Sequence, residues 1–294
     1  MSYSTSAVKV IEVEEKFDLV FSRPLGYVFA LVAKSCRLTP TQVSLLSMIA
    51  GVLGGYYLYF QNNIVMISWG CLLLVIAGVL DSSDGILARM TQKTSHLGYI
   101  IDGFIDNIVF LSAYLGGTIY LSSIYGWQIF IVAMIAGAGH SIRALIYKIY
   151  IDDCAYLFGD QESLQRPEPL SLSSLSDQRG IGAKILYYLY HDQTRKQWLL
   201  GTRSSEMYQQ FKAFKKSHCE QFKEKYKSEF VPLLTLWALV GGCNIHRFLI
   251  MGFSLMGHFE WFLYTGILLN IPTLVIWLIQ RYRDRRFLAE MGLI

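Results

Sequence analysis

Four aspartates stand between residues 81 and 106, in stretches otherwise apolar enough to cross a membrane: Asp81, Asp84, Asp102 and Asp106. Burying an ionisable side chain at the depth of a bilayer is costly, so such a residue is a candidate for function by default. Neighbouring carboxylates repel one another unless cations lie between them, and clustered oxygen ligands suit Mg²⁺ or Mn²⁺. The residue types and their spacing therefore predict a site for divalent metal ions.

The spacing also predicts which side chains face one another. Steps of three and four residues return to the same side of a helix, so residues 81, 84, 85 and 88 share one face, and residues 98, 102 and 106 share a face of the next helix. The linker from Met90 to Leu97 is short and polar, so we expect antiparallel helices with these faces opposed. Gly85 and Gly98 leave room for a flat ligand or a neighbouring helix, and Arg89 could supply a charge for a phosphate.

Taken together, these residues form the pattern D-x2-D-G-x2-A-R-x8-G-x3-D-x3-D. The pattern resembles, without substitution, that of the CDP-alcohol phosphotransferase (CDP-alcohol phosphatidyltransferase) family. The segment from Arg23-Pro24 to the Leu38–Ser44 entry into the first apolar stretch is most similar to the branch of inositol-phosphate and phosphatidylinositol synthases.

The resemblance implies an enzyme that cleaves the pyrophosphate of a CDP-linked donor, passes a substituted phosphoryl group to an alcohol and releases CMP. It implies two divalent ions, Mg²⁺ or Mn²⁺, held by the four aspartates, and it makes Asp106 the base that takes the proton of the acceptor. The CDP moiety would lie against four residues: Gly85, Ala88, Arg89 and Gly98. The alternative is a pair of acid-bearing helices neutralised by salt bridges, but these spans hold no comparable set of cations.

The composition is that of a membrane protein. Of the 294 residues, 53% are hydrophobic and only 16% are charged, whereas about a quarter are charged in an average soluble domain. Windows of about 20 apolar residues predict an all-α polytopic membrane protein with six transmembrane helices, an N-terminal juxtamembrane helix and a cytoplasmic helical insertion. The six predicted spans are Val43–Phe60, Val65–Leu87, Leu97–Ser122, Trp127–Tyr150, Phe230–Leu255 and Phe259–Arg281.

The distribution of Lys and Arg predicts the orientation. The connections near residues 61–64 and 123–126 contain neither residue, whereas the segment before the first span, the 90–97 linker and the C-terminal tail contain them. This alternation places both termini and the aspartate motif on the cytoplasmic side. The N-terminus lacks the pattern of a signal peptide, and we expect a bacterial inner membrane as the location.

We divide the chain into an N-terminal interfacial region (1–42), four spans with the motif (43–150), a cytoplasmic insertion (151–229), two further spans (230–281) and a basic tail (282–294). Within the insertion we expect an irregular loop over Gly159–Gly182 and two helices, Lys184–Leu200 and Ser205–Phe230. Its 12 Lys and Arg nearly balance its 11 Asp and Glu, which argues against nucleic-acid binding. Two interpretations stay open: a structural or dimer-supporting hairpin, and a lid that governs acceptor specificity.

Three polar residues outside the motif are candidates for contact with an acceptor or phosphate: Ser141, Arg143 and Arg247. Arg143 could instead extend to lipid headgroups, and Arg247 could instead reach the outer interface. His246 is a weaker candidate as a metal ligand, because the aspartates already supply hard oxygen ligands. Gly51, Gly54 and Gly55 predict close packing between spans.

The function expected from these features is transfer of a phosphatidyl group from CDP-diacylglycerol to inositol, inositol phosphate or glycerol phosphate, in membrane lipid biosynthesis. A first alternative reverses the roles, with a CDP-linked headgroup such as CDP-inositol or CDP-ethanolamine as donor to a lipid or soluble alcohol. A second is a cation-coupled transporter, although the acids lie at one end of their spans and the spans show no internal repeat. The resemblance also implies a homodimer.

Overall fold

The computed structural model describes residues 15, 17–92, 96–157, 166, 180–217 and 219–292, and every regular element among them is a helix. The chain divides into two compact units. The first consists of the residues up to Ser141 together with Cys243–Asn270, and the second of Ile142–Gly242 together with Ile271–Ile294. The all-α class expected from the sequence is confirmed for the described residues.

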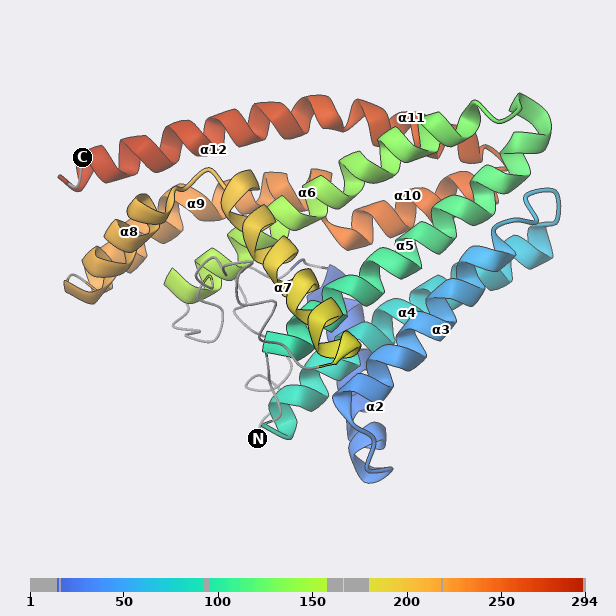
Figure 1. Cartoon of the computed structure of the whole chain (residues 1–294), viewed down its shortest axis with the longest axis horizontal. Coiled ribbons are helices and arrows are strands. Elements are labelled where there is room, and N and C mark those ends of the chain that lie inside the picture. Colours follow the sequence, from blue (N-terminus) through green and yellow to red (C-terminus); the bar gives the residue numbers. More distant parts are fainter. Residues whose placement is uncertain are drawn as a thin grey trace. The chain divides into compact units, whose positions relative to one another are not determined.

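The first unit contains the aspartate motif. Helix α3 packs against both α4 and α5, and α2 packs against α4, as the neighbouring ribbons in Figure 1 show. Helix α6 begins in this unit and continues into the second. The helices are η2 (Asp18–Ser22, a π-helix), α2 (Arg23–Ser35), α3 (Pro40–Tyr57), α4 (Ile64–Met90), α5 (His96–Tyr125), α6 (Ile129–Leu157), α10 (Cys243–Leu255) and α11 (Phe259–Leu268).

Local sequence accounts for where α3 begins. Thr39 caps the helix: its hydroxyl accepts from the backbone N–H of Gln42 at 3.3 Å, while the Gln42 side chain accepts from the Thr39 N–H at 2.8 Å. Pro40 occupies the first turn, where its missing N–H is not needed. Helix α3 thus begins at Pro40 with Thr39 as its cap, and upstream η2 ends at Ser22 and α2 begins at Arg23, next to Pro24.

Glycines set how closely the helices approach. A Cβ added at Gly55 would lie 2.7 Å from the backbone nitrogen of Ala113 on α5, and one added at Gly54 would lie 3.0 Å from the carbonyl oxygen of Gly70 on α4. Side chains at these positions would push the helices apart. The close packing predicted for these glycines is therefore confirmed.

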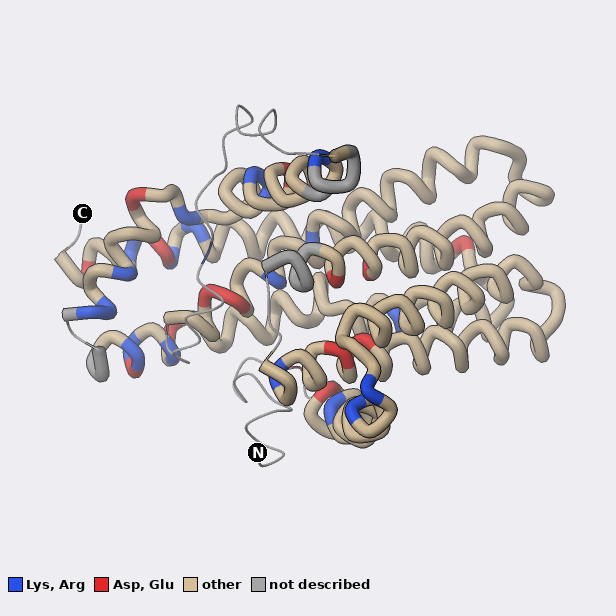
Figure 2. Tube along the Cα trace, turned by 60° about the horizontal axis from the view of Figure 1, so that its bottom comes forward, with Lys and Arg blue, Asp and Glu red and all other residues tan. Residues whose placement is uncertain are grey.

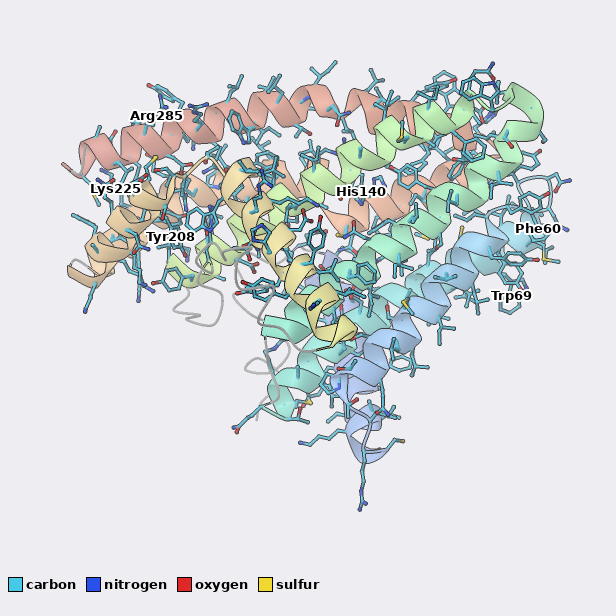
Figure 3. All side chains as sticks on the ribbon, viewed as in Figure 1. Phe60, Trp69, His140, Tyr208, Lys225 and Arg285 are labelled. Carbon is cyan, nitrogen blue, oxygen red and sulfur yellow. The ribbon has the colours of Figure 1, made fainter. Side chains whose placement is uncertain are left out.

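Five helical segments of the described chain are long and apolar enough to cross a membrane: Ile64–Met90, Ile101–Tyr125, Ile129–Leu157, Phe222–Leu255 and Phe259–Glu290. Figure 2 shows long stretches of helix without a charged residue, and apolar side chains such as Trp69, 55% exposed, project outward (Figure 3). The protein is thus a polytopic membrane protein. The predicted first span, Val43–Phe60, corresponds to the 18-residue helix α3, which is not among the five, so the sixth crossing stays a prediction.

The second unit contains the later part of α6 and four further helices: α7 (Ile181–Leu200), α8 (Ser205–Ser217), α9 (Cys219–Gly241) and α12 (Asn270–Glu290). Helix α7 confirms the first helix predicted in the insertion. Most of the loop predicted over Gly159–Gly182 lies outside the described residues.

The single helix predicted over Ser205–Phe230 is wrong, because α8 ends at Ser217 and α9 begins at Cys219. The rings of Phe211 and Phe222 pack with centroids 6.2 Å apart. In one straight helix these residues would be separated by about 16 Å along the axis. The chain turns between them because the aromatic side chains of the two segments pack together.

A buried ion network holds the second unit together. Arg203, fully buried between α7 and α8, donates to Asp153 on α6 and to Asp284 on α12, each at 2.9 Å, and Arg166 pairs with Asp153 as well. Burial disfavours the charged guanidinium, but the two carboxylates hold the pKa of Arg203 well above its usual value. Four aromatic rings surround it: Phe211, Phe230, Tyr226 and Tyr150. Arg203 thereby bonds the insertion to α6 and to α12, which favours a structural role for it.

Candidate active site and metal centre

Three carboxylates of the motif converge as the spacing predicted. Oxygen atoms of Asp81 and Asp84 on α4 and of Asp102 on α5 all lie within 4.8 Å of one another. Asp84 is buried, with 6% of its surface exposed, and the other two are half-buried. Two unit charges at that separation repel by about 3 kcal/mol at an effective dielectric constant of about 20. The arrangement suits a divalent cation with oxygen ligands.

Asp106 lies one turn after Asp102 on α5 and is half-buried. It is not a member of the group of three, but its charge acts on Asp81 together with those of the other two aspartates. All four predicted carboxylates therefore belong to one electrostatic cluster.

A serine that sequence reasoning left without a role supports the cluster. The Ser44 hydroxyl on α3 lies within hydrogen-bonding distance of the Asp84 carboxylate and, at 3.1 Å, of the Pro40 carbonyl. One turn further along α3, the Ser47 hydroxyl donates to the Ala77 carbonyl on α4 at 2.8 Å. The only signal in the sequence is a pair of hydroxyls in an apolar helix, which does not reveal their partners.

The residues predicted to contact CDP lie next to the carboxylates along the chain. Among the described residues, a Cβ added at Gly85 would meet only Nη1 of Arg89, at 3.6 Å, so none of these neighbours requires a glycine there. This leaves space for a ligand beside a guanidinium. Ala88 is half-buried on the same helix. Gly98 lies in the first turn of α5, in a stretch whose side-chain surroundings are outside the described structure.

Arg247 on α10 lies against the motif helix. A Cβ added at Gly78 would lie 2.6 Å from Cζ of Arg247, so the guanidinium occupies space that only a glycine leaves free. Gly78 precedes Asp81 by one turn, and the charge of Arg247 acts on Asp81. Of the two interpretations of Arg247, this position agrees with lining the polar site and not with reaching the outer interface. Its contact with an acceptor stays a prediction.

The other two residues predicted to contact the acceptor belong to different units. The Ser141 hydroxyl donates to Oδ1 of Asn107, the residue after Asp106, at 3.4 Å. Arg143 belongs to the second unit and is fully buried on α6. The predicted contacts of both with a phosphate stay predictions.

A histidine pair was not foreseen. The imidazole rings of His140 (Figure 3) and His246 stack with centroids 3.4 Å apart and planes 10° apart, and the Tyr114 hydroxyl lies 3.2 Å from Nε2 of His246. Stacked parallel rings direct their lone pairs within separate planes, so they do not converge on one ion. Among the described residues, the group that could hold a metal ion consists of carboxylates alone.

Comparison with known proteins agrees with this geometry. The family model described as CDP-alcohol phosphatidyltransferase matches residues 37–151, which contain the whole aspartate motif and Ser44. The chain is also similar to archaetidylinositol phosphate synthase of Pyrococcus horikoshii, with 31% identity over 101 residues. That match covers 34% of this chain and spans about half the length of the relative, 50%. Residues 37–151, which hold the four aspartates, are thus similar to the CDP-alcohol phosphatidyltransferase family.

Proposed function

We propose that the protein transfers a phosphatidyl-type group from a CDP-linked lipid, with CDP-diacylglycerol as the donor, to an inositol phosphate, with release of CMP. The observation that carries the proposal is the convergence of Asp81, Asp84 and Asp102 within 4.8 Å, inside the region matched to the family. The similarity to an archaetidylinositol phosphate synthase favours inositol phosphate over inositol and glycerol phosphate as the acceptor.

The four aspartates would hold two divalent ions, Mg²⁺ or Mn²⁺, whose charge would neutralise the pyrophosphate of the donor and the leaving CMP. Six charged side chains near the reaction centre then fall into two sets. The carboxylates of the cluster balance the ions, whereas the guanidiniums of Arg89 and Arg247 remain to hold phosphate oxygens. Gly85 leaves the space in which the nucleotide would lie beside Arg89.

Asp106 would act as the general base. The hydroxyl of the acceptor would attack the donor phosphorus in line with the departing CMP, and its proton would pass to the Asp106 carboxylate. The position of Asp106 at the edge of the cluster supports this role, because a carboxylate enclosed by ligands on every side would be a weak proton acceptor.

The membrane arrangement that goes with this chemistry has six crossings, with α3 as the first, and both termini on the cytoplasmic side. The site would then face the compartment in which CDP-linked donors are made, in a bacterial inner membrane. Many large apolar side chains are exposed on the first unit, which supports contact with lipid acyl chains. A homodimer is part of the proposal on the family resemblance alone.

The test is CMP release by the purified protein in detergent, with Mg²⁺ or Mn²⁺, CDP-diacylglycerol and a panel of alcohols. We expect CMP that depends on inositol phosphate and disappears in Asp84→Ala. The matched control is Asp192→Ala, which removes a partly exposed carboxylate on α7 that pairs with Lys196. Folded protein that releases no CMP with any acceptor on the panel would refute this donor, and CDP-inositol and CDP-ethanolamine would be tried next.

A further inference from the structure

One asparagine joins three charged side chains in the first unit. Asn244, the second residue of α10, is 6% exposed. Its Nδ2 donates to Oε2 of Glu15 and to Oδ1 of Asp18, both at 2.9 Å, and its Oδ1 accepts from Nη1 of Arg247 at 3.3 Å. Both donor positions and the carbonyl of this amide are thus used. A single neutral side chain ties two carboxylates of the N-terminal segment to a guanidinium on α10.

This connection ends at the carboxylate cluster. Arg247 lies across Gly78, and its charge acts on Asp81. Glu15 is joined to this arrangement through Asn244, which bonds both Glu15 and Arg247. The N-terminal segment therefore borders the site.

The order of residues along α4 indicates on which side of the carboxylate cluster Arg247 lies. Gly78 precedes Asp81, whereas Gly85 follows it, and these two glycines are separated by about 10 Å along the helix axis. In-line transfer requires the attacking oxygen and the departing CMP on opposite sides of the phosphorus. If CMP departs toward Gly85 and Arg89, the acceptor approaches from the side of Arg247.

We propose that Asn244 is a positioning residue for the acceptor, and that Glu15 and Asp18 anchor it. Asn244 fixes the guanidinium of Arg247 so that its planar fork meets the phosphate of the acceptor. The N-terminal segment thereby takes part in acceptor binding. This inference rests on the function proposed above.

The experiment is a swap of the hydrogen-bonding groups, read out by steady-state kinetics with myo-inositol phosphate as the acceptor. Asn244→Asp removes both amide N–H donors and places a third carboxylate next to those of Glu15 and Asp18. We expect the KM for inositol phosphate to rise about tenfold or more, because a hydrogen bond to a charged group contributes to that extent. We expect kcat and the Mg²⁺ concentration for half activation to change by less than about threefold, because the interaction is one of ground-state binding.

Two further variants separate positioning from general damage. Glu15→Gln with Asp18→Asn keeps oxygen acceptors for Asn244, so the rise in KM should be small. Adding these two changes to Asn244→Asp supplies amide donors to the new carboxylate, so the KM should fall back toward that of the wild type. Asn63→Asp is the matched control, because Asn63 caps α4 through its side-chain oxygen and Asp caps a helix equally well.

The outcomes are distinct. The positioning role would be overturned if Asn244→Asp lost kcat, metal activation and acceptor binding to the same extent. It would also be overturned if the triple variant had a KM for inositol phosphate no lower than that of Asn244→Asp. If Asn244→Asp does not fold, Asn244→Ser breaks the same bonds without adding a charge, and the same selective rise in KM is expected. Wild-type protein without acceptor-dependent CMP release would overturn the proposed function and this inference together, whereas an active wild type with unchanged KM in the variants would overturn the inference alone.

Discussion

Removing the Ser44 hydroxyl tests whether the carboxylate cluster is a metal site. Asp84 is the most buried carboxylate of the three that converge, and the Ser44 side chain is its hydrogen-bonding neighbour on α3. A hydrogen bond to a charged group contributes about 1.5 to 3 kcal/mol. Loss of a group that orients a metal ligand lowers metal affinity by about 10- to 100-fold. We therefore expect Ser44→Ala to raise the Mg²⁺ or Mn²⁺ concentration for half-maximal CMP release by about tenfold or more.

The chain offers a matched control one turn away. Ser47 is also buried on α3 and also bonds α4, but its partner is the backbone carbonyl of Ala77. Ser47→Ala removes a neutral hydrogen bond worth about 0.5 to 1.5 kcal/mol and leaves every carboxylate as it is. We expect it to lower the thermal stability in detergent without shifting the metal dependence. Ser44→Thr, which keeps a hydroxyl, should retain most of the metal affinity.

The assay is CMP release as a function of metal concentration at saturating donor and acceptor, with unfolding temperatures measured on the same preparations. Equal metal dependence in Ser44→Ala and wild type would refute the assignment of Asp84 as a metal ligand supported by Ser44. Equal shifts in Ser44→Ala and Ser47→Ala would show instead that loosening the contact between α3 and α4 is the cause.

Four other substitutions give separable results. Asp106→Asn should retain binding of the CDP-linked donor but lose turnover, measured as CMP release. Asp81→Asn should lose turnover and also lose metal-dependent binding of the donor. Near-normal CMP release by Asp106→Asn would show that Asp106 is not the base. Gly85→Ala should fold normally, since the added Cβ meets only Arg89 at 3.6 Å, and should raise the KM for the donor; an unchanged KM would show that no nucleotide approaches Gly85. Arg203→Met should destabilise the protein by about 3 to 5 kcal/mol, because it leaves Asp153 and Asp284 buried without their shared guanidinium. A denaturant or thermal unfolding curve that matches that of the wild type would contradict this expectation.

The sequence predicted the carboxylate cluster because the relevant information is local. Residues three and four apart share a helix face, and a short polar linker makes consecutive helices antiparallel. Those two facts suffice to bring Asp81, Asp84 and Asp102 together. The cap at Thr39 and the close approach at Gly54 and Gly55 follow from similarly local chemistry.

Local patterns were less informative in the insertion. The apolar periodicity of Ser205–Phe230 is continuous, so it predicts one helix, yet the structure has two, α8 and α9. This arrangement brings Phe211 against Phe222 and Phe287, and the last of these comes from a segment more than 60 residues away. Periodicity identifies an apolar face, but it does not identify what that face packs against.

The sequence by itself thus determined the helical class, the membrane character and the carboxylate cluster. Only the tertiary structure decided the partners of that cluster: Ser44 beside Asp84, Arg247 across Gly78, and Asn244 between the N-terminal segment and α10. The physical reason is that such contacts depend on the register and crossing of helices far apart in the chain. Packing throughout the whole unit fixes that register, and no spacing within one segment encodes it.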